Sequence, residues 1–258
     1  MTVPPARTAV ITGASSGIGA AVALELAAAG YRLGLVGRND ARLSEVGQRC
    51  LTAGAASCKI AVLDIRDGAG FARFIESFGV VDLYISNAGI LDGRREGEVV
   101  ESRAAALEVL DVNLRASIDG LHTVLGAMQR RGSGQIVLVS SLGGISPLAD
   151  APAYSASKAG LVAYGIALRD ALHGTGIGVT VACPGYVRTQ MGTQHIGDRP
   201  FELTAGNAAR RILRAARKNR ALCGFPFPLY PAVHLSLLVP DVIRRLFTRG
   251  VRFTVRDA

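Results

Sequence analysis

Short apolar runs alternate with helical stretches along most of this 258-residue chain, and this alternation restricts the fold more than any other feature. Apolar runs bounded by turn residues indicate buried strands, whereas apolar positions three or four residues apart indicate helices. Strands that are each followed by a helix pair in parallel, so we expect an α/β fold with a doubly wound parallel sheet and helices on both faces. The predicted strands cover 8–12, 31–36, 58–63, 83–86, 135–140 and 178–182, and the predicted helices cover 17–29, 41–53, 69–78, 99–130, 153–173 and 207–218.

The order of the predicted elements gives no sign of a second domain. No linker rich in proline, glycine or serine precedes about Gly185, and no internal repeat is visible. We therefore expect one domain over 1–258. The periodicity fails between 186 and 205, which is typical of a loop over a ligand site, here a substrate loop. Residues 225–258 form a C-terminal segment of a different composition.

Positive charge is concentrated in the C-terminal part of the chain. The chain has 29 lysines and arginines against 20 aspartates and glutamates, a formal net charge of +9. Residues 210–258 hold 11 of the basic residues and 2 of the acidic ones, so the remainder is neutral. Three uses fit this basic and apolar segment: a lid over an apolar substrate, a subunit interface, or contact with a membrane surface of anionic lipid. Nucleic acid is not expected as a partner, because no recognised binding motif accompanies the charge.

The cysteines and the N-terminus favour a cytoplasmic protein. Cys50, Cys58, Cys183 and Cys223 form no C-x-x-C pair and no cluster with zinc-ligand spacing, so we expect free thiols and no metal site. No signal peptide is visible at the N-terminus. The apolar stretch 221–239 is interrupted by three prolines, which argues against a regular membrane-spanning helix.

A glycine-rich turn joins the first predicted strand to the first predicted helix. Glycines in such a turn let the backbone approach a pyrophosphate, and the helix N-terminus offers free N–H groups to it. The spacing G-x-x-x-G-x-G differs from the common G-x-G-x-x-G of dinucleotide-binding proteins, but the strand–turn–helix context favours the same function. The candidate cofactor-binding residues of this turn are Gly13, Ser15, Ser16, Gly17, Ile18 and Gly19.

The end of the second predicted strand bears on the choice between NAD and NADP. NAD-dependent enzymes place a carboxylate there for the adenosine ribose. This strand instead leads into Gly37 and Arg38, and a guanidinium favours the 2′-phosphate of NADP. Arg38 could also be a solvated loop residue. Asp64, after the third predicted strand, could bind the adenine amino group or could cap the following helix.

Tyr154 and Lys158 stand four residues apart at the start of a predicted helix and therefore point to one face. The chain has only three lysines, and one of them is placed here. An ammonium group near a phenol lowers the pKa of the phenol and makes it a usable acid or base. Ser141, just past the end of a strand, could donate a hydrogen bond to a carbonyl oxygen, although Ser140 could compete for that role.

These motifs, together with Asn87-Ala88-Gly89, Asn113 and Pro184-Gly185, occur in the order and spacing of the short-chain dehydrogenase/reductase family, which the chain resembles over about two thirds of its length. The resemblance implies a Rossmann-type fold. It also implies that Tyr154 donates or accepts the proton and that Ser141 orients the carbonyl group. Lys158 would hold the nicotinamide ribose and tune Tyr154.

The same resemblance gives roles to residues that sequence spacing alone does not explain. Asn113 would hold a water molecule in a proton relay, and the alternative is an amide that simply bridges backbone at a helix kink. Asn87, Ala88 and Gly89 would shape the nucleotide pocket. The nicotinamide end of the cofactor would lie against Pro184, Gly185, Val187 and Thr189.

The family resemblance also bears on assembly. Members commonly pair through the helices that correspond to 99–130 and 153–173, so we expect a homodimer or homotetramer. After Cys223 the chain departs from the family pattern, and Pro240 begins a predicted amphipathic helix.

The sequence therefore predicts an NADP(H)-dependent oxidoreductase that interconverts a small-molecule carbonyl compound and a secondary alcohol. The alternatives are a non-catalytic NADP-binding or sensing protein and a membrane-surface protein that uses the basic segment. A hydrophobic substrate is expected, with Arg188 or Arg199 as the candidate anchors for an acidic one. The residues expected to line its pocket are Leu142, Gly143, Ile145, Leu148, Tyr186 and Met191.

Overall fold

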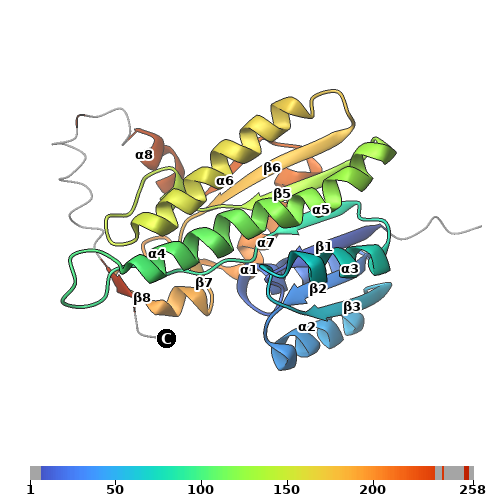
Figure 1. The fold of residues 1–258 in the computed structure, drawn as a ribbon, viewed down its shortest axis with the longest axis horizontal. Coiled ribbons are helices and arrows are strands. Elements are labelled where there is room, and N and C mark those ends of the chain that lie inside the picture. The colour runs from blue at the N-terminus through green and yellow to red at the C-terminus, as the bar shows by residue number, and fades with distance from the viewer. Residues whose placement is uncertain (1–6, 236–239, 241–252, 256–258) are drawn as a thin grey trace, which may run out of the picture.

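Seven parallel strands form the main sheet of the structure, a computed structural model that describes residues 7–235, 240 and 253–255. The strands are β1 (Thr8–Thr12), β2 (Arg32–Gly37), β3 (Ser57–Val62), β4 (Leu83–Ser86), β5 (Gly134–Val139), β6 (Ile177–Pro184) and β10 (Leu222–Phe225). They lie in the order β10-β6-β5-β4-β1-β2-β3 (Figure 1). The predicted α/β fold with a doubly wound, Rossmann-type parallel sheet is confirmed.

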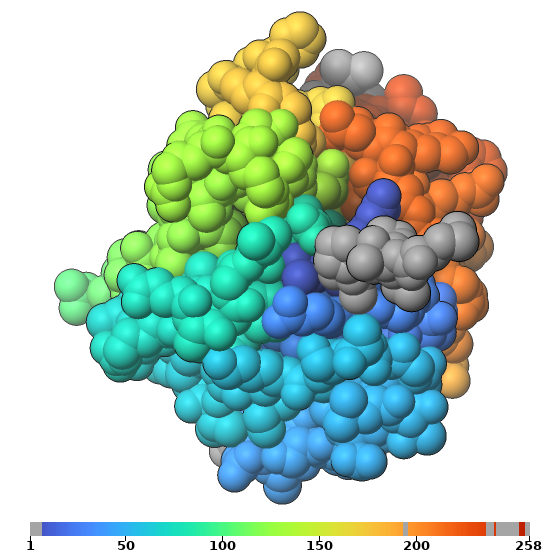
Figure 2. Space-filling view, turned by 90° about the vertical axis from the view of Figure 1, so that its right-hand side faces the viewer, coloured from blue at the N-terminus to red at the C-terminus, as the bar shows by residue number. Residues whose placement is uncertain are grey.

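Helices cover both faces of this sheet. They are α1 (Gly17–Ala27), α2 (Asp40–Thr52), α3 (Gly68–Phe78), α4 (Arg103–Leu110), α5 (Ala116–Arg131), α6 (Pro152–Ala171), α7 (Ala205–Arg217) and α8 (Leu229–Leu235). One hydrophobic core contains side chains of α1, α2 and α7, and a second contains those of α3, α5 and α6. From the side, the chain up to α3 fills the lower half of the visible face, in blue and teal, with α5 and α7 above it in green and orange (Figure 2).

The strand side chains alternate between these two cores. In β1, Ala9 and Ile11 enter the first core and Val10 enters the second. Successive strand residues point to opposite faces, and here both faces are buried. The apolar runs of the sequence are continuous for this reason, which is why they predict strands so well.

The long helical stretch expected over 99–130 is interrupted in the structure. Ser102 caps the start of α4 by accepting a hydrogen bond from the Ala105 N–H, so the helix begins later than expected. A π-helical turn over Asp111–Arg115 then separates α4 from α5. Such turns insert an extra residue into a helix and often occur at functional sites. Asn113 lies in the middle of this turn.

The described part of the C-terminal segment returns to the body of the molecule. Phe225 is buried in the first core, whereas Phe227 is 82% exposed. The last described strand, β11 (Thr254–Val255), pairs antiparallel with β8 (His195–Ile196). The amphipathic helix predicted after Pro240 lies outside the described residues. No helix in the described part of the chain is long and apolar enough to cross a membrane.

The irregular stretch predicted over 186–205 contains only short elements in the structure. Besides β8 it holds β7 (Val187–Arg188) and β9 (Leu203–Thr204), which pair with one another in parallel. β8 and α8 lie on the same side of the molecule as the start of α6 (Figure 1). This side is where the candidate site is found.

Candidate active site

Two adjoining cavities lie at the carboxyl ends of the strands. The larger, of about 420 Å³, is lined by the loops that follow β1, β2, β3 and β4. The smaller, of about 290 Å³, is lined mainly by the loops that follow β5 and β6 and by α6. Ligands of open α/β sheets bind at this edge, where the strand order reverses. The cavities share the lining residues Ile18, Asn87, Thr189 and Met191.

The predicted cofactor residues divide between the two cavities, with Gly19 packed behind the glycine-rich turn. Those at the larger cavity, which we call the nucleotide cavity, are Gly13, Ser15, Ser16, Gly17, Ile18, Arg38, Asp64, Asn87, Ala88, Gly89 and Thr189. Those at the smaller cavity, which we call the catalytic cavity, include Tyr154, Lys158, Pro184, Gly185 and Val187.

The glycine-rich turn is fastened to the end of β4. The Asn87 side-chain amide donates to the carbonyls of Thr12 and Gly13, at 3.1 and 3.2 Å. In return, the Thr12 hydroxyl accepts from the backbone N–H groups of Asn87 and Ala88, at 3.0 and 3.1 Å. Gly13 has a φ of 65°, and a Cβ there would come within 2.8 Å of the Ala88 backbone. The turn therefore needs glycine at this position.

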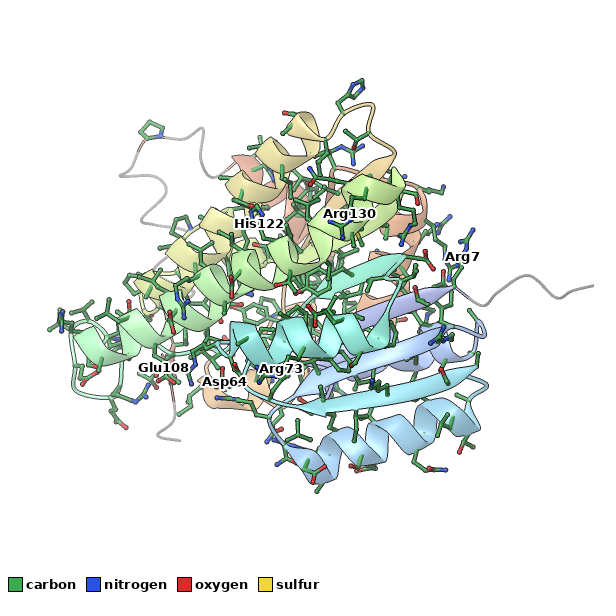
Figure 3. All side chains as sticks on the ribbon, turned by 45° about the vertical axis from the view of Figure 1, so that its right-hand side comes forward. Arg7, Asp64, Arg73, Glu108, His122 and Arg130 are labelled. Carbon is green, nitrogen blue, oxygen red and sulfur yellow. The ribbon has the colours of Figure 1, made fainter. Side chains whose placement is uncertain are left out.

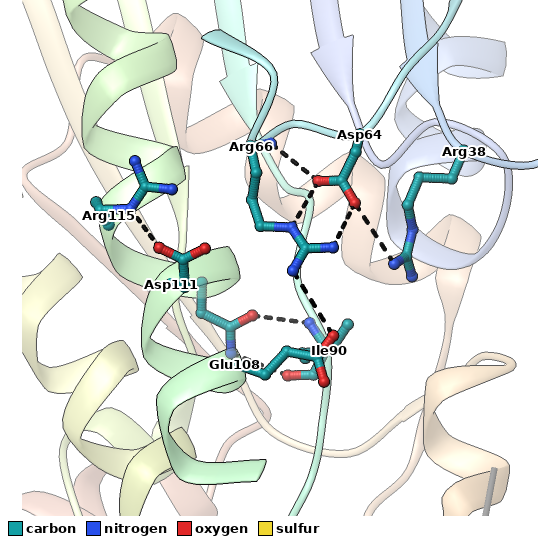
Figure 4. A network of polar contacts seen from close by, with 8 residues as sticks. Arg38, Asp64, Arg66, Ile90, Glu108, Asp111 and Arg115 are labelled. Carbon is teal, nitrogen blue, oxygen red and sulfur yellow. Dashed lines mark hydrogen bonds and ion pairs between the residues drawn. The ribbon is translucent and has the colours of Figure 1, made fainter. Parts of the chain in front are cut away.

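Asp64 lies at the centre of a charged network beside the nucleotide cavity. Its carboxylate is 3.8 Å from Arg38 and accepts two hydrogen bonds from the Arg66 guanidinium, at 3.0 and 2.8 Å (Figure 4). These hydrogen bonds, above all, lower the pKa of Asp64. Arg66 also pairs with Glu108, which lies near Asp64 in Figure 3. Asp64 does not cap the following helix, because Asp67 does so by accepting from the Gly70 N–H.

Arg42 is a second arginine at the nucleotide cavity that the sequence did not single out. It stands in the first turn of α2, and Asn39 caps that turn by accepting from its backbone N–H. Its guanidinium donates to the Gln190 side chain, yet its Nε is buried and has no hydrogen-bond partner in the described part of the chain. Asn39, directly after Arg38, is a typical helix N-cap, and this signal could have placed Arg42 in the first helical turn beside the cavity.

Ser141 and Tyr154 meet at the wall of the catalytic cavity. Ser141 caps a short 3₁₀ turn after β5 by accepting from the Gly143 N–H at 3.0 Å. Its side chain and that of Tyr154, in the first turn of α6, both line the cavity. Glu101 holds that first turn by accepting from the Ala153 N–H at 2.6 Å. Burial raises the pKa of Tyr154, and the nearby Ser141 hydroxyl opposes part of that rise.

Lys158 is buried one helical turn after Tyr154. Its Nζ donates to the Val139 carbonyl at 3.0 Å and lies 5.8 Å from the centre of the Tyr154 ring. Burial lowers the pKa of Lys158 to about 8. The sequence predicted that this ammonium lowers the pKa of Tyr154, but the pKa is raised, because burial of the phenol is the largest effect on it. Tyr154 therefore keeps its proton at neutral pH.

The lowered pKa of Lys158 can be measured by NMR titration. With three lysines in the chain, the nitrogen-15 side-chain NMR signals can be assigned from Lys59→Arg and Lys218→Arg variants. We expect the Lys158 signal of the cofactor-free protein to titrate near pH 8. Between about 8 and 10.5 the amine is then neutral in the folded chain and protonated in the unfolded one, so its contribution makes the free energy of unfolding rise with pH. A titration midpoint at pH 10.5 would show that burial does not shift the pKa of Lys158.

Asn113 lies behind the catalytic cavity and is fully buried. Its side chain makes two hydrogen bonds with the backbone of Ile90, accepting from the N–H at 2.7 Å and donating to the carbonyl at 2.9 Å. It also donates to the Ser157 hydroxyl at 3.3 Å. From within the π-helical turn, the side chain thus binds the backbone of Ile90, which is the structural alternative considered from sequence. Its part in a proton relay stays a prediction.

The rest of the catalytic cavity is largely apolar. Leu142, Gly143, Leu148, Tyr186 and Met191 line it as predicted, whereas Ile145 packs nearby without lining it. The structure adds residues from distant parts of the chain, namely Leu91, Leu229, Val233 and Phe253.

The two arginines considered as anchors for an acidic substrate are both paired with Glu202. Arg199 lines the catalytic cavity and lies 2.9 Å from the carboxylate of Glu202. Arg188 does not line the cavity and lies 3.3 Å from the same carboxylate. One carboxylate shared by two guanidinium groups offsets part of their positive charge.

Comparison with known proteins agrees with this arrangement. The family model described as short chain dehydrogenase matches residues 7–199. An uncharacterized oxidoreductase of Myxococcus xanthus is 30% identical over 250 residues, which cover 95% of this chain and 98% of the relative. The putative ketoacyl reductase of monensin polyketide synthase from Streptomyces virginiae is 36% identical over 199 residues, 74% of each chain.

A solved structure leads to the same family. A variant of actinorhodin polyketide ketoreductase with NADPH superimposes with a TM-score of 0.77 at 27% identity, covering 87% of this chain and 97% of the other. The family model covers most of the chain, including the glycine-rich turn, Ser141, Tyr154 and Lys158. The chain therefore belongs to the short-chain dehydrogenase/reductase family of oxidoreductases.

Proposed function

We propose that this oxidoreductase uses NADP(H) to interconvert an apolar ketone or aldehyde and the corresponding alcohol. The observation that carries this proposal is that the side chains of Ser141 and Tyr154 line the same apolar cavity, which adjoins the nucleotide cavity. A carbonyl group that enters the apolar cavity would meet both hydroxyls next to the cofactor.

The residues at the nucleotide cavity fit a dinucleotide with a 2′-phosphate. The glycine-rich turn leaves room for a diphosphate against the N-terminus of α1, where Ser16 makes no side-chain cap. Arg38 and Arg42 flank the end of β2, and the buried Nε of Arg42 has no partner within the described residues. Such an orphaned donor suits an added phosphate oxygen. Asp64 would bind the adenine, Lys158 the ribose, and Thr189 the nicotinamide amide.

The chemistry divides among few groups. Bound NADPH would supply the hydride that reduces the carbonyl carbon. Tyr154, whose raised pKa keeps its proton in place, would donate that proton to the carbonyl oxygen. Ser141 would hold the same oxygen by a hydrogen bond, and the Lys158 amine would favour the tyrosinate that forms.

Cofactor choice makes the first test of this proposal. We expect the full chain to bind NADPH more tightly than NADH, and Arg38→Ala to weaken NADPH binding roughly tenfold to a hundredfold, because a charged hydrogen bond to phosphate is lost. Arg42→Ala should act in the same direction. NADH binding should not change in either variant.

Fluorescence titration of the pure protein with each cofactor measures these affinities. Arg73→Ala is the matched control, because Arg73 is an exposed arginine on α3 that does not line the cavity. Equal affinities for NADPH and NADH in the unchanged protein would refute the preference for NADP.

The substrate class is tested by NADPH oxidation across uncharged ketones and aldehydes, keto acids and acyl thioesters. We expect turnover of apolar ketones or aldehydes and much slower turnover of keto acids, because Arg199 is already paired with Glu202. Turnover confined to keto acids would overturn the proposed substrate class.

Two further proposals concern assembly and location. A homodimer or homotetramer through α5 and α6 stays a prediction, and the half-exposed Leu107 on neighbouring α4 adds apolar surface there. Contact of the basic C-terminal segment with a membrane surface also stays a prediction, supported by the exposed Phe227 and by the arginines of α7.

A further inference from the structure

A phenylalanine from the end of the chain forms part of the catalytic cavity. Phe253 lines that cavity although it lies 99 residues after Tyr154 in the sequence. It is only 3% exposed and packs in a small apolar cluster with Ala151 and Val255. Leu148 and Tyr154 pack against the same cluster. The aromatic ring is therefore close both to the apolar wall of the cavity and to the proposed proton donor.

The backbone of Phe253 is held by a buried ion pair. The Asp150 carboxylate accepts from the Phe253 N–H at 3.0 Å and from Arg94 Nε at 2.8 Å. Arg94 Nη2 donates to the Phe253 carbonyl at 3.3 Å. Both polar groups of the Phe253 backbone thus bind the two members of one ion pair, whose carboxylate side chain is fully buried.

Backbone contacts hold three distant segments together around this pair. The Arg94 N–H donates to the Asp150 carbonyl at 2.7 Å, and the Val255 N–H donates to the Arg94 carbonyl at 3.1 Å. A Cβ at Gly93 would collide with the Asp150 carbonyl, so the segments approach as closely as glycine permits. Asp150 stands directly before Ala151, the cap of α6, which carries Tyr154 in its first turn. Asp150 therefore both holds the end of the chain and lies directly before the helix that carries Tyr154.

We propose that Phe253 is a specificity-determining residue that limits the length of apolar substrates, and that Arg94 and Asp150 are the positioning residues that hold it in the cavity wall. The proposal rests on the proposed function of the catalytic cavity as a site for apolar carbonyl compounds. Phe253 lines that cavity and not the nucleotide cavity. Its replacement should therefore change substrate choice without changing cofactor affinity.

The test measures kcat/KM for straight-chain methyl ketones from butanone to decanone. Phe253→Ala removes most of a large aromatic side chain, and we expect the ratio of kcat/KM for decanone to that for butanone to rise roughly tenfold to a hundredfold. Arg94→Lys retains a cation for Asp150 but loses the fork that also reaches the Phe253 carbonyl. It should shift the ratio in the same direction by less.

Phe227→Ala is the matched control, because it makes the same substitution at a phenylalanine that is 82% exposed and lines neither cavity. The ratio should not change in this variant. NADPH affinity equal to that of the unchanged protein shows that each variant is folded. An unchanged ratio in a folded Phe253→Ala variant would overturn the proposal.

A binding measurement separates this inference from the proposed function. Bound ketones raise the melting temperature of the NADPH complex, so the shift can be recorded for each ketone whether or not it is reduced. One outcome is that the unchanged protein reduces no ketone while, in Phe253→Ala, longer ketones become the ones that raise the melting temperature most. In that case the proposed reaction is wrong and the role of Phe253 stands. If ketones are reduced and neither the ratio nor the shifts move, the role of Phe253 is wrong and the proposed reaction stands.

Discussion

Replacing Tyr154 by phenylalanine is expected to lower kcat for carbonyl reduction by roughly 10²–10⁴-fold, the usual contribution of a positioned acid. The substitution removes one hydroxyl and keeps the ring that packs against the cluster of Ala151, Phe253 and Val255. NADPH affinity should therefore change little. Stopped-flow measurement of NADPH oxidation, with the affinity from fluorescence titration, separates the two effects.

Tyr164→Phe provides the matched control for this experiment. Tyr164 stands on the same helix and loses the same atom, but its hydroxyl bonds His122, away from both cavities. Its kcat should stay near that of the unchanged protein. Near-normal turnover in Tyr154→Phe would remove this tyrosine from the mechanism.

Replacing Ser141 by alanine is expected to lower kcat/KM by roughly 10²–10³-fold, as does loss of one donor to a developing oxyanion. Ser140→Ala should have a much smaller effect on turnover. The Ser140 hydroxyl is engaged elsewhere, because it donates to the Lys158 carbonyl at 2.7 Å within the core. Its loss should instead lower the free energy of unfolding by about 1 kcal/mol.

Steady-state kinetics and urea unfolding of the two variants distinguish these roles. The adjacent serines serve as controls for one another, since each substitution removes a hydroxyl from the same turn. The opposite ranking, with Ser140→Ala the slower enzyme, would assign the carbonyl to Ser140.

The sequence predicted the sheet because its strands are buried on both faces. In runs such as Ala9 to Ile11, successive side chains pack into the two cores on opposite faces of the sheet, so no polar residue interrupts the run. The edge strand β10 had no predicted range, and its residues are only partly buried apart from Phe225. The irregularity at Asn113 was considered only as a helix kink and not as a π-helical turn, since an inserted residue leaves no periodic signal over five positions.

The candidate site was predictable where its residues are close in sequence. Ser141, Tyr154 and Lys158 lie within one strand–turn–helix unit, so their spacing in the sequence predicts that they line the same cavity. The contact of Phe253 with Asp150 joins segments 103 residues apart, and no local pattern encodes it. The pKa of Tyr154 could not be predicted in direction, because burial of the phenol depends on the whole cavity wall.

Transfer of deuterium from NADPH to product tests the central claim most directly. NADPH dideuterated at nicotinamide C4 is incubated with the full chain and a ketone that it reduces, and the alcohol is analysed by mass spectrometry. We predict one deuterium on the carbinol carbon of the alcohol, at a rate that falls in Tyr154→Phe. Oxidation of the labelled cofactor without deuterium in an alcohol, or no oxidation with any ketone or aldehyde tested, would contradict the account.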